Sequence, residues 1–370
     1  MSNITKNNMT RREFHLGAAA TVAGATALTT GLMTGGTALA EEAGKPLQRI
    51  LFGSCCHQNK PQPIWDPILK LEPELFIFLG DNIYGDSRDM GVLKAKYDKQ
   101  RKNFAPLLKK TPAVAIWDDH DFGENDAGKE YPFRDQSKDL FFDFWDEPKD
   151  SPRRRDGDGI YGSWLYGPEE QRVQVILPDL RYMRDSLRTV TSREAYRERD
   201  LVGFGPYLPV KEEKTMLGEA QWQWLEEQLK VPAKLRIIGS SLQFLSSQPG
   251  WECWSNFPHE RKRLIDLIEK HKAEGVIFIS GDTHWAELSC QTEGAPYPLW
   301  DLTSSGLTET WPNVSPNVYR WNDKSFAGQN FGGIYIDWEQ DDPMVVMEVR
   351  DNKGTRVLQH SILLSSLSFK

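Results

Sequence analysis

The segment LFIFLGDNIYGD, residues 75–86, gives the strongest indication of fold in this sequence. Its first five residues are continuously apolar, and so short an apolar run is typical of a strand buried on both faces. Polar residues follow at once, beginning with Gly80 and Asp81, so titratable groups stand where the chain leaves the strand. We therefore expect an α/β protein whose chemistry lies beyond the carboxyl ends of its strands.

Strands and helices alternate on both sides of this segment. Apolar runs predict strands at residues 49–54, 113–117, 160–166, 172–177, 235–239 and 275–279, and helical spacing predicts helices at 64–71, 91–108, 136–145, 218–229 and 258–270. Residues 146–159 and 184–209 show neither an apolar run nor helical spacing, and we expect them to be irregular. Residues 332–364 are expected to form late strands with a turn at 351–354. Together they predict one large α/β domain, completed by strands near the C-terminus.

The composition excludes several function classes. The 370 residues hold 45 Lys and Arg against 53 Asp and Glu, a net charge of −8. This balance argues against a nucleic-acid-binding surface or an anionic-membrane surface, both of which need a basic face. An acidic chain can still bind phosphate through metal ions. Four cysteines are too few for a disulfide scaffold, although a pairing of Cys253 with Cys290 stays open.

The first forty residues have the pattern of an export signal. Arg11 and Arg12 precede an apolar stretch at 16–33, and Ala38-Leu39-Ala40 forms a cleavage motif. The paired arginines indicate the twin-arginine type, cleaved after Ala40, which leaves a domain of residues 41–370. A membrane anchor is the alternative, but the many Gly and Thr residues make the stretch poorly hydrophobic, and we expect no stable membrane span in the mature chain. We expect the twin-arginine export machinery to deliver the protein to the periplasm or the extracellular space.

Four polar clusters directly follow four of the predicted strands. They are GSCCH at 53–57, GDNIYGD at 80–86, DDHD at 118–121 with Asn125 beyond it, and SGDTH at 280–284. Each cluster taken alone also fits a turn or a solvated loop. Their shared position after strands allows them to converge on one site, and carboxylate, imidazole, amide, phenol and thiol groups are the ligands of a metal centre.

These motifs, in this order, resemble the PhoD-like alkaline phosphatase family of metallophosphatases. The stretches IYGSWLYG, LPDLRYMRD, LGEAQWQWLEEQL and GSSLQFLS add to the resemblance, which runs from about residue 49 to residue 305. It implies a four-layer αββα sandwich of the calcineurin-like metallophosphatase type, with a metal cluster at one edge of two facing sheets. It also implies an exported metal-dependent phosphoesterase, an alkaline phosphatase or phosphodiesterase.

Carried over by motif, the resemblance assigns a role to each cluster. Asp81 would bridge the metals, Cys55, Tyr84 and His284 would bind the first metal, and Asn125 and Asp282 would bind the second. The family implies iron and calcium in a dinuclear or larger centre.

The residue types by themselves support part of this assignment. Phenolate and thiolate ligands favour Fe³⁺, whereas amide and carboxylate oxygens suit Ca²⁺ or another divalent ion such as Mg²⁺. Two cations can hold a phosphoryl group between them, and a metal-bound hydroxide would be the nucleophile. His120 is expected to act as general acid, or to support the leaving oxygen electrostatically.

Several placements have alternatives at this stage. Asp119 or Asp121 could replace Asn125, Cys56 could replace Cys55, and Gln243 is a weaker candidate ligand of the second metal. Arg88 and Arg181 are candidates for contacting substrate phosphate, since guanidinium groups match its geometry.

Two other functions compete with the phosphoesterase. One is a cysteine-dependent hydrolase that uses Cys55 or Cys56 with His57 or His120. The other is a non-catalytic metal- or ligand-binding module, in which some of the 13 Trp and 11 Tyr would stack on a ligand. The choice between phosphomonoesters and phosphodiesters depends on the shape of the site, which motifs do not record.

Overall fold

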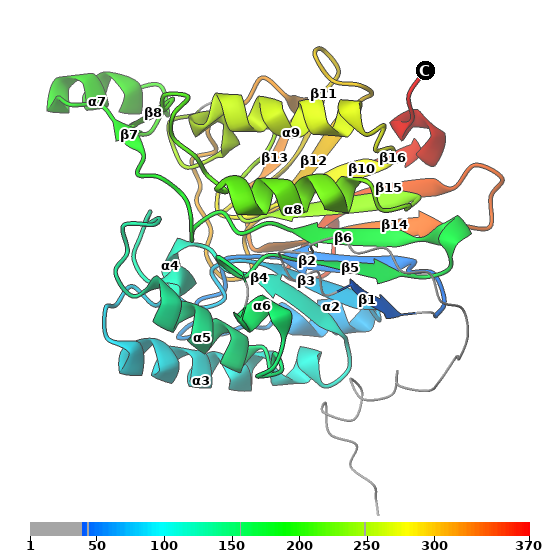
Figure 1. Ribbon diagram of the computed structural model, residues 1–370, viewed down its shortest axis with the longest axis horizontal. Helices are drawn as coiled ribbons and strands as arrows, with labels where there is room; N and C mark the ends of the chain where they lie inside the picture. Colours follow the sequence, from blue (N-terminus) through cyan, green and yellow to red (C-terminus); the bar gives the residue numbers. More distant parts are fainter. Residues whose placement is uncertain (1–38, 43, 156, 248) are drawn as a thin grey trace, which may run out of the picture. The chain divides into compact units, whose positions relative to one another are not determined.

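Two β-sheets face each other between two layers of helices (Figure 1). The computed structural model describes residues 39–42, 44–155, 157–247 and 249–370. One sheet has six strands in the order β16 (Arg356–Leu363), β15 (Met344–Asp351), β14 (Asn330–Asp337), β2 (Arg49–Gly53), β3 (Leu75–Leu79) and β4 (Ala113–Ile116). The other has eight, in the order β1 (Leu39–Glu42), β5 (Gly162–Tyr166), β6 (Val173–Leu177), β9 (Leu235–Ser240), β10 (Val276–Ser280), β12 (Leu299–Ser304), β11 (Ala286–Gln291) and β13 (Arg320–Phe326).

Helices cover the outer face of each sheet. In Figure 1, α8 (Glu219–Leu229) and α9 (Pro258–Lys270) lie over the eight-stranded sheet, while α2 (Trp65–Lys70), α3 (Met90–Leu108) and α5 (Arg134–Phe144) lie under the six-stranded sheet. Shorter helices are α4 (Asp119–Phe122), α6 (Pro152–Arg155) and α7 (Arg193–Asp200), with 3₁₀ turns at Glu169–Gln171, Trp254–Asn256 and Leu364–Leu367. The expected four-layer αββα sandwich is confirmed.

The centre of the sandwich sets the position of the site. β2, β3 and β4 are mutually parallel, and β6, β9, β10 and β12 run parallel in the facing sheet. All five residues of β3 are buried, as its apolar run predicts. Gly239 on β9 lets the sheets approach, because a Cβ there would lie 3.0 Å from Leu79 of the opposite sheet and 2.4 Å from Leu177. Parallel strands align their carboxyl ends, so the loops after them meet at one edge.

Parts of the fold differ from the sequence-based expectation. Residues 184–209, expected to be irregular, contain α7 and the two-stranded pair β7 (Arg188–Thr189) and β8 (Tyr207–Leu208), and residues 146–159 contain α6. α7 has no buried residue, so no apolar stripe marks it, and its start is capped by Ser192, whose hydroxyl accepts from the Ala195 amide at 3.1 Å.

Strands β11 to β13 were also missing from the sequence-based assignment. β11 and β12 bury polar residues, which hides the usual apolar pattern. Asp301 of β12, for example, accepts from the Ser280 hydroxyl at 2.5 Å and from the amides of Phe244 and Leu245. The late strands β14 to β16 and the turn at 351–354, where the Gly354 amide donates to Asp351 O at 2.9 Å, were expected and are confirmed.

The start of the chain is described from residue 39 onward. Strand β1 pairs in parallel with β5, and the expected cleavage point after Ala40 falls within it. The expected twin-arginine motif and apolar stretch lie outside the described residues. Within the described ranges, no helix has both the length and the apolar character needed to cross a bilayer. Cys253 and Cys290 are both free thiols, as are Cys55 and Cys56.

Candidate metal centre

Four loops at the shared edge of the two sheets bring their polar residues together. Cys55 follows β2, Asp81 follows β3, Asp119 opens α4 just after β4, and Asp282 follows β10. The loops are tied to one another, since the amides of Cys55 and Cys56 donate to the carbonyls of Gly80 and Asp81 at 3.3 and 2.9 Å. The convergence expected from the strand pattern is therefore present.

Several of these residues have an unusual backbone conformation. Cys55, Asp81, Asp282 and His284 have φ values of 62°, 49°, 67° and 64°. Residues other than glycine rarely adopt this left-handed region, and such local strain concentrates at functional sites. The sharp turns direct side chains from separate strand ends toward one point.

The first group of side chains contains the thiol, phenol and imidazole. Cys55 Sγ lies 3.4 Å from Asp81 Oδ2, and Tyr84 Oη lies 3.1 Å from His284 Nε2. Cys55, Asp81 and His284 each place one potential ligand atom within 4.8 Å of the other two. Burial lowers the pKa of His284 to about 4, so its imidazole is neutral and able to bind a metal at neutral pH.

A second group contains carboxylates and shares members with the first. The potential ligand atoms of Asp118, Asp119 and Asp282 also lie within 4.8 Å of one another. The same holds for those of Asp81, Asp119 and His120. Because Asp81 and Asp119 link these sets, the potential ligand atoms form one continuous cluster. This arrangement of donors fits a centre of more than one metal ion.

The cluster gathers buried carboxylates whose negative charge a bound cation would stabilise. Burial raises the pKa of Asp81 and of Asp282 well above the usual range, and neighbouring carboxylates raise both further. Oδ1 of Asp81 and Oδ2 of Asp118 are buried and find no hydrogen-bond partner among the described residues. A buried carboxylate oxygen without a partner is costly, and a coordinated cation would satisfy it. The residues therefore fit a metal centre.

His120 is held at the border of this cluster by an acidic partner. Its Nδ1 lies 2.7 and 2.9 Å from the two carboxylate oxygens of Asp86. Burial alone would lower the pKa of His120, but the charges of Asp81, Asp86 and Asp119 raise it to about 11. The His120 ring also packs against the Tyr84 ring, with centroids 4.3 Å apart. The His57 ring stacks on the Tyr84 ring as well, with centroids 4.9 Å apart.

Asp121 and Gln243 have hydrogen-bond partners within the protein. Asp121 Oδ1 accepts from the amides of Asp81 and Asp118 at 3.2 and 2.6 Å, and Oδ2 accepts from the amide and side chain of Asn82 at 3.2 and 2.5 Å. This carboxylate thus joins the loops after β3 and β4. Gln243 Nε2 donates to Glu287 and Thr303 at 3.1 and 2.9 Å. These contacts favour a bracing role for both residues over metal binding.

The two candidate phosphate-binding arginines lie in very different surroundings. Arg181 is fully buried and forms ion pairs with Asp118 at 2.5 Å and with Glu252 at 2.7 Å. It compensates carboxylates from behind the cluster rather than reaching outward. Arg88 is exposed and pairs with Glu124 through two hydrogen bonds of 2.5 and 3.0 Å. Both guanidinium groups already have carboxylate partners.

Asn125 is exposed, in the turn between α4 and Asp126. Its neighbour Asp126 forms a further candidate group with Asp119 and Glu252, two of whose members sequence reasoning did not single out. Glu252 carries no motif in the sequence, because it follows Gly250 and Trp251 in a polar loop far from any predicted strand end.

A segment after β12 was also missed, although it joins two of the predicted ligand loops. The amides of Leu307 and Thr308 donate to the carbonyls of Ser54 and Cys55 at 3.1 Å each, and the Trp311 amide donates to His284 O at 2.9 Å. The Ser305 hydroxyl lies 3.0 Å from Cys55 Sγ and accepts from the His284 amide at 2.9 Å. We call residues 305–311 the bridging segment. Its sequence, SGLTETW, contains no metal-ligand pattern that would have marked it.

The two thiols near the cluster are poor nucleophiles as the chain places them. Burial raises the pKa of Cys55 and Cys56 well above the usual thiol range, and the charges of Asp81 and Asp282 raise that of Cys55 further. A cysteine-dependent hydrolase needs a thiolate, which arises in positively charged surroundings. These acidic surroundings favour a metal centre instead.

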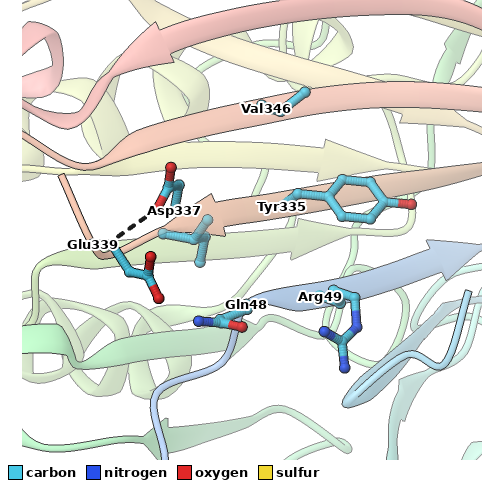
Figure 2. Close-up of a pocket in the computed structure, with 7 residues that line it drawn as sticks. Gln48, Arg49, Tyr335, Asp337, Glu339 and Val346 are labelled. Atoms are coloured by element: carbon cyan, nitrogen blue, oxygen red, sulfur yellow. Dashed lines mark hydrogen bonds between the residues drawn. The ribbon is translucent and has the colours of Figure 1, made fainter.

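A separate hollow lies on the six-stranded sheet. Figure 2 shows its lining, which comes from the region of β2, β14 and β15 and includes Arg49, Tyr335 and Glu339. None of the predicted site residues lines it. We assign no role to this hollow in the chemistry.

Comparison with known proteins gives a consistent picture. The profile of the PhoD-like phosphatase family matches residues 93–317, a range that includes Asp119, His120, Asp282 and His284. The chain is 26% identical over 227 residues to alkaline phosphatase D of Bacillus subtilis (strain 168), covering 53% of this chain and 36% of that protein. The chain thus spans little more than a third of the length of this relative.

Solved structures with the same arrangement include that of PhoD. The two superpose with a TM-score of 0.57 at 16% identity, over 87% of this chain and 74% of the PhoD chain. A dimetal phosphatase from Danio rerio aligns over 88% of this chain and 100% of its own, at 15% identity and a TM-score of 0.49, on which we base no argument. The likeness to PhoD supports the fold.

Proposed function

The chain belongs to the PhoD-like phosphatase family, and on this premise we propose that it is an exported, metal-dependent phosphoesterase that hydrolyses phosphomonoesters, phosphodiesters or both. The observation that carries the proposal is the buried cluster around Asp81. It joins thiol, phenol, imidazole and carboxylate groups and leaves carboxylate oxygens without hydrogen-bond partners among the described residues. Such a cluster is costly unless cations neutralise it.

We propose a division of ligands that follows the two overlapping groups. Cys55, Tyr84 and His284 would hold one ion, which their thiolate and phenolate character suits to Fe³⁺. Asp119, Asp282 and the exposed Asn125 would hold a second ion such as Ca²⁺, with Asp81 shared between the two. Bound together, the ions would supply positive charge to the phosphoryl oxygens and activate the attacking water.

The chain's own residues would position the reacting groups. Asp86 holds the His120 ring through Nδ1, which leaves Nε2 to donate to the leaving oxygen. Asp121 keeps the loops after β3 and β4 in register, so Asp81 and Asp118 stay in place. Arg181 balances the carboxylates of Asp118 and Glu252 from the protein interior.

The metal content and the hydrolytic activity can be tested together. We expect the purified protein to hydrolyse a panel of phosphomonoesters and phosphodiesters, and we expect EDTA with an iron chelator to abolish this activity. Activity that survives complete metal removal would contradict the proposal and favour a thiol enzyme. The ratio of activity on the two ester classes would then show which class the site prefers.

The export proposal rests on the N-terminal motif. We expect replacement of Arg11 and Arg12 by lysine to leave the protein inside the cell, because the paired arginines are the part of the signal that the export route reads. Cell fractionation measures where the double variant accumulates. Normal export of this variant would contradict the twin-arginine assignment.

A further inference from the structure

The bridging segment ends in an exposed aromatic residue beside the metal cluster. Trp311 has 41% of its surface exposed, although its backbone is fixed to His284 by the 2.9 Å amide-to-carbonyl bond. Its indole lies 6.1 Å from the His284 ring, measured between ring centroids. His284 Nε2 is directed at Tyr84 Oη in the cluster, so the indole lies beside a proposed ligand of the metal centre.

A second indole supports the first. The rings of Trp251 and Trp311 lie 5.4 Å apart at an angle of 50°. Trp251 is half-buried and comes from the loop after β9, whereas Trp311 comes from the loop after β12. Two aromatic rings from distant parts of the chain thus pack together beside the cluster, and we call this pair the aromatic wall. Large exposed aromatic side chains are expensive to leave in water and are common where ligands bind.

The segment around α7 packs Trp251 from behind and holds it in place. Gly205 lies so close that a Cβ there would come within 2.6 Å of Trp251 Cδ2 and 2.3 Å of Gly250 O. The Gly205 amide donates to Pro249 O at 2.8 Å, and Arg199 Nε donates to Gly205 O at 2.7 Å. The aromatic wall is therefore preformed, which lowers the entropic cost of binding against it.

The cationic side chains described around the cluster are already engaged. Lys60 pairs with Glu309 at 2.8 Å, Arg88 pairs with Glu124, and Arg181 is buried against carboxylates. Positive side chains are thus poorly placed to recognise a substituent on the substrate alcohol. The two indoles offer a broad apolar contact surface beside the cluster.

We propose that Trp311, backed by Trp251, forms a subsite for a flat ring carried by the alcohol part of the phosphate ester. This inference rests on the proposed phosphoesterase function. The phosphoryl group would lie at the metal cluster, and the ring would stack on or against the indole of Trp311. Stacking accepts any flat ring, so the chemistry covers both aryl esters and nucleoside phosphates.

Binding of two non-hydrolysable probes tests the subsite without requiring turnover. We expect the purified protein to bind phenylphosphonate more tightly than methylphosphonate, as measured by calorimetry. Trp311→Ala should weaken phenylphosphonate binding on the order of tenfold, the usual scale for loss of one stacking partner, and should leave methylphosphonate binding unchanged. Trp321→Ala is the matched control, because Trp321 is 38% exposed but packs against Trp300 and His360. Metal content measured in each variant shows whether the cluster is intact.

Steady-state kinetics separates the two ring sources. We expect Trp311→Ala to raise KM for p-nitrophenyl phosphate, for adenosine 5′-monophosphate, or for both, and to leave glycerol 3-phosphate unaffected. The ester with the larger rise identifies the ring the subsite prefers. Equal losses on all three esters, or equal binding of both phosphonates to the wild type, would overturn the subsite. If no ester is hydrolysed while the phosphonates are still discriminated, the proposed function fails and the subsite stands.

Discussion

The phenol oxygen of Tyr84 and Nε2 of His284 lie 3.1 Å apart, although 200 residues separate them in the sequence. Tyr84 belongs to the loop after β3 in one sheet, and His284 belongs to the loop after β10 in the other. Their contact joins the two sheets at the candidate metal centre. Burial raises the pKa of the Tyr84 phenol well above its usual range, and the charges of Cys55 and Asp81 raise it further, so a phenolate there needs a cation.

Replacement of Tyr84 tests whether this phenol binds iron. We expect Tyr84→Phe to remove the visible absorption that an iron–phenolate bond gives, while the far-ultraviolet circular dichroism stays that of the wild type. The measurement is the absorption spectrum of the concentrated protein as purified. An unchanged visible band in the variant would show that another group produces it.

Replacing Asp81 or Asp121 by asparagine gives two matched variants that should change the stability of the metal-free protein in opposite directions. In chelator-treated protein at pH 8, Asp81→Asn should unfold at an equal or higher temperature than the wild type, because it removes a carboxylate whose charge is disfavoured by burial and by the neighbouring carboxylates. Without chelator, it should unfold at a lower temperature, because it loses metal. Thermal unfolding with and without chelator measures both. A lower unfolding temperature under both conditions would mean that Asp81 acts chiefly as a structural acceptor.

Asp121→Asn should destabilise the protein whether or not metal is present. Both carboxylate oxygens accept hydrogen bonds from the loops after β3 and β4, and an amide can replace them only in part. We expect a loss of about 1–3 kcal/mol in the free energy of unfolding. Urea denaturation with and without chelator checks this. A loss confined to the metal-loaded protein would instead identify Asp121 as a ligand.

Arg181 is expected to stabilise the fold rather than to bind substrate. Its removal in Arg181→Met leaves Asp118 buried without its ion-pair partner and leaves Glu252 paired with Arg184 alone, and breaking a buried pair costs about 3–5 kcal/mol. Arg88→Ala serves as a control, because its pair with Glu124 is exposed and should contribute little to stability. Unfolding free energies of both variants test the contrast. Full stability of Arg181→Met with a raised KM would restore Arg181 to the substrate site.

The acid stability of the two helices over the eight-stranded sheet has an identifiable source. Glu226 on α8 accepts from Lys270 and His271 at the end of α9, each at 2.7 Å, and these bonds lower its pKa from 4.5 to about 2. A lowered pKa gives stability that is present above pH 4.5 and is lost as the pH falls toward 2.

We therefore expect Glu226→Gln to reduce the free energy of unfolding at pH 6 by about 1 kcal/mol or less, given the partial exposure of the pair. The difference from the wild type should shrink as the pH falls from 4.5 toward 2. Glu227→Gln is the adjacent control, since Glu227 pairs with Lys230, the residue directly after α8, and not with α9. A difference that grows on acidification would contradict the assigned sign.

The sequence predicts the central part of this fold because its signals are local. The apolar run at 75–79 and the polar residues after it mark a buried strand and a loop of the candidate site, and the parallel arrangement then places four such loops at one edge. Where polar residues are buried by long-range contacts, the same reasoning fails. Asp301 and Glu287 sit inside the eight-stranded sheet, so β11 and β12 lack an apolar pattern.

The sequence indicates the residue types that meet in the cluster, but not the contacts that support them. Arg181 carries the residue type of a phosphate-binding group, yet its position after β6 places it beneath the cluster. Trp311 and the bridging segment are set by backbone hydrogen bonds to Ser54, Cys55 and His284, and such bonds leave no trace in residue type. Chain topology decides these features, and one sequence does not display it.

Elemental analysis of the purified full chain, with hydrolysis of phosphate esters assayed on the same sample, tests the central claim most directly. We predict about two or more bound metal ions per chain, iron among them, and a parallel loss of metal and hydrolysis in Asp81→Asn. A metal-free protein that hydrolyses phosphate esters at the full rate would contradict the account.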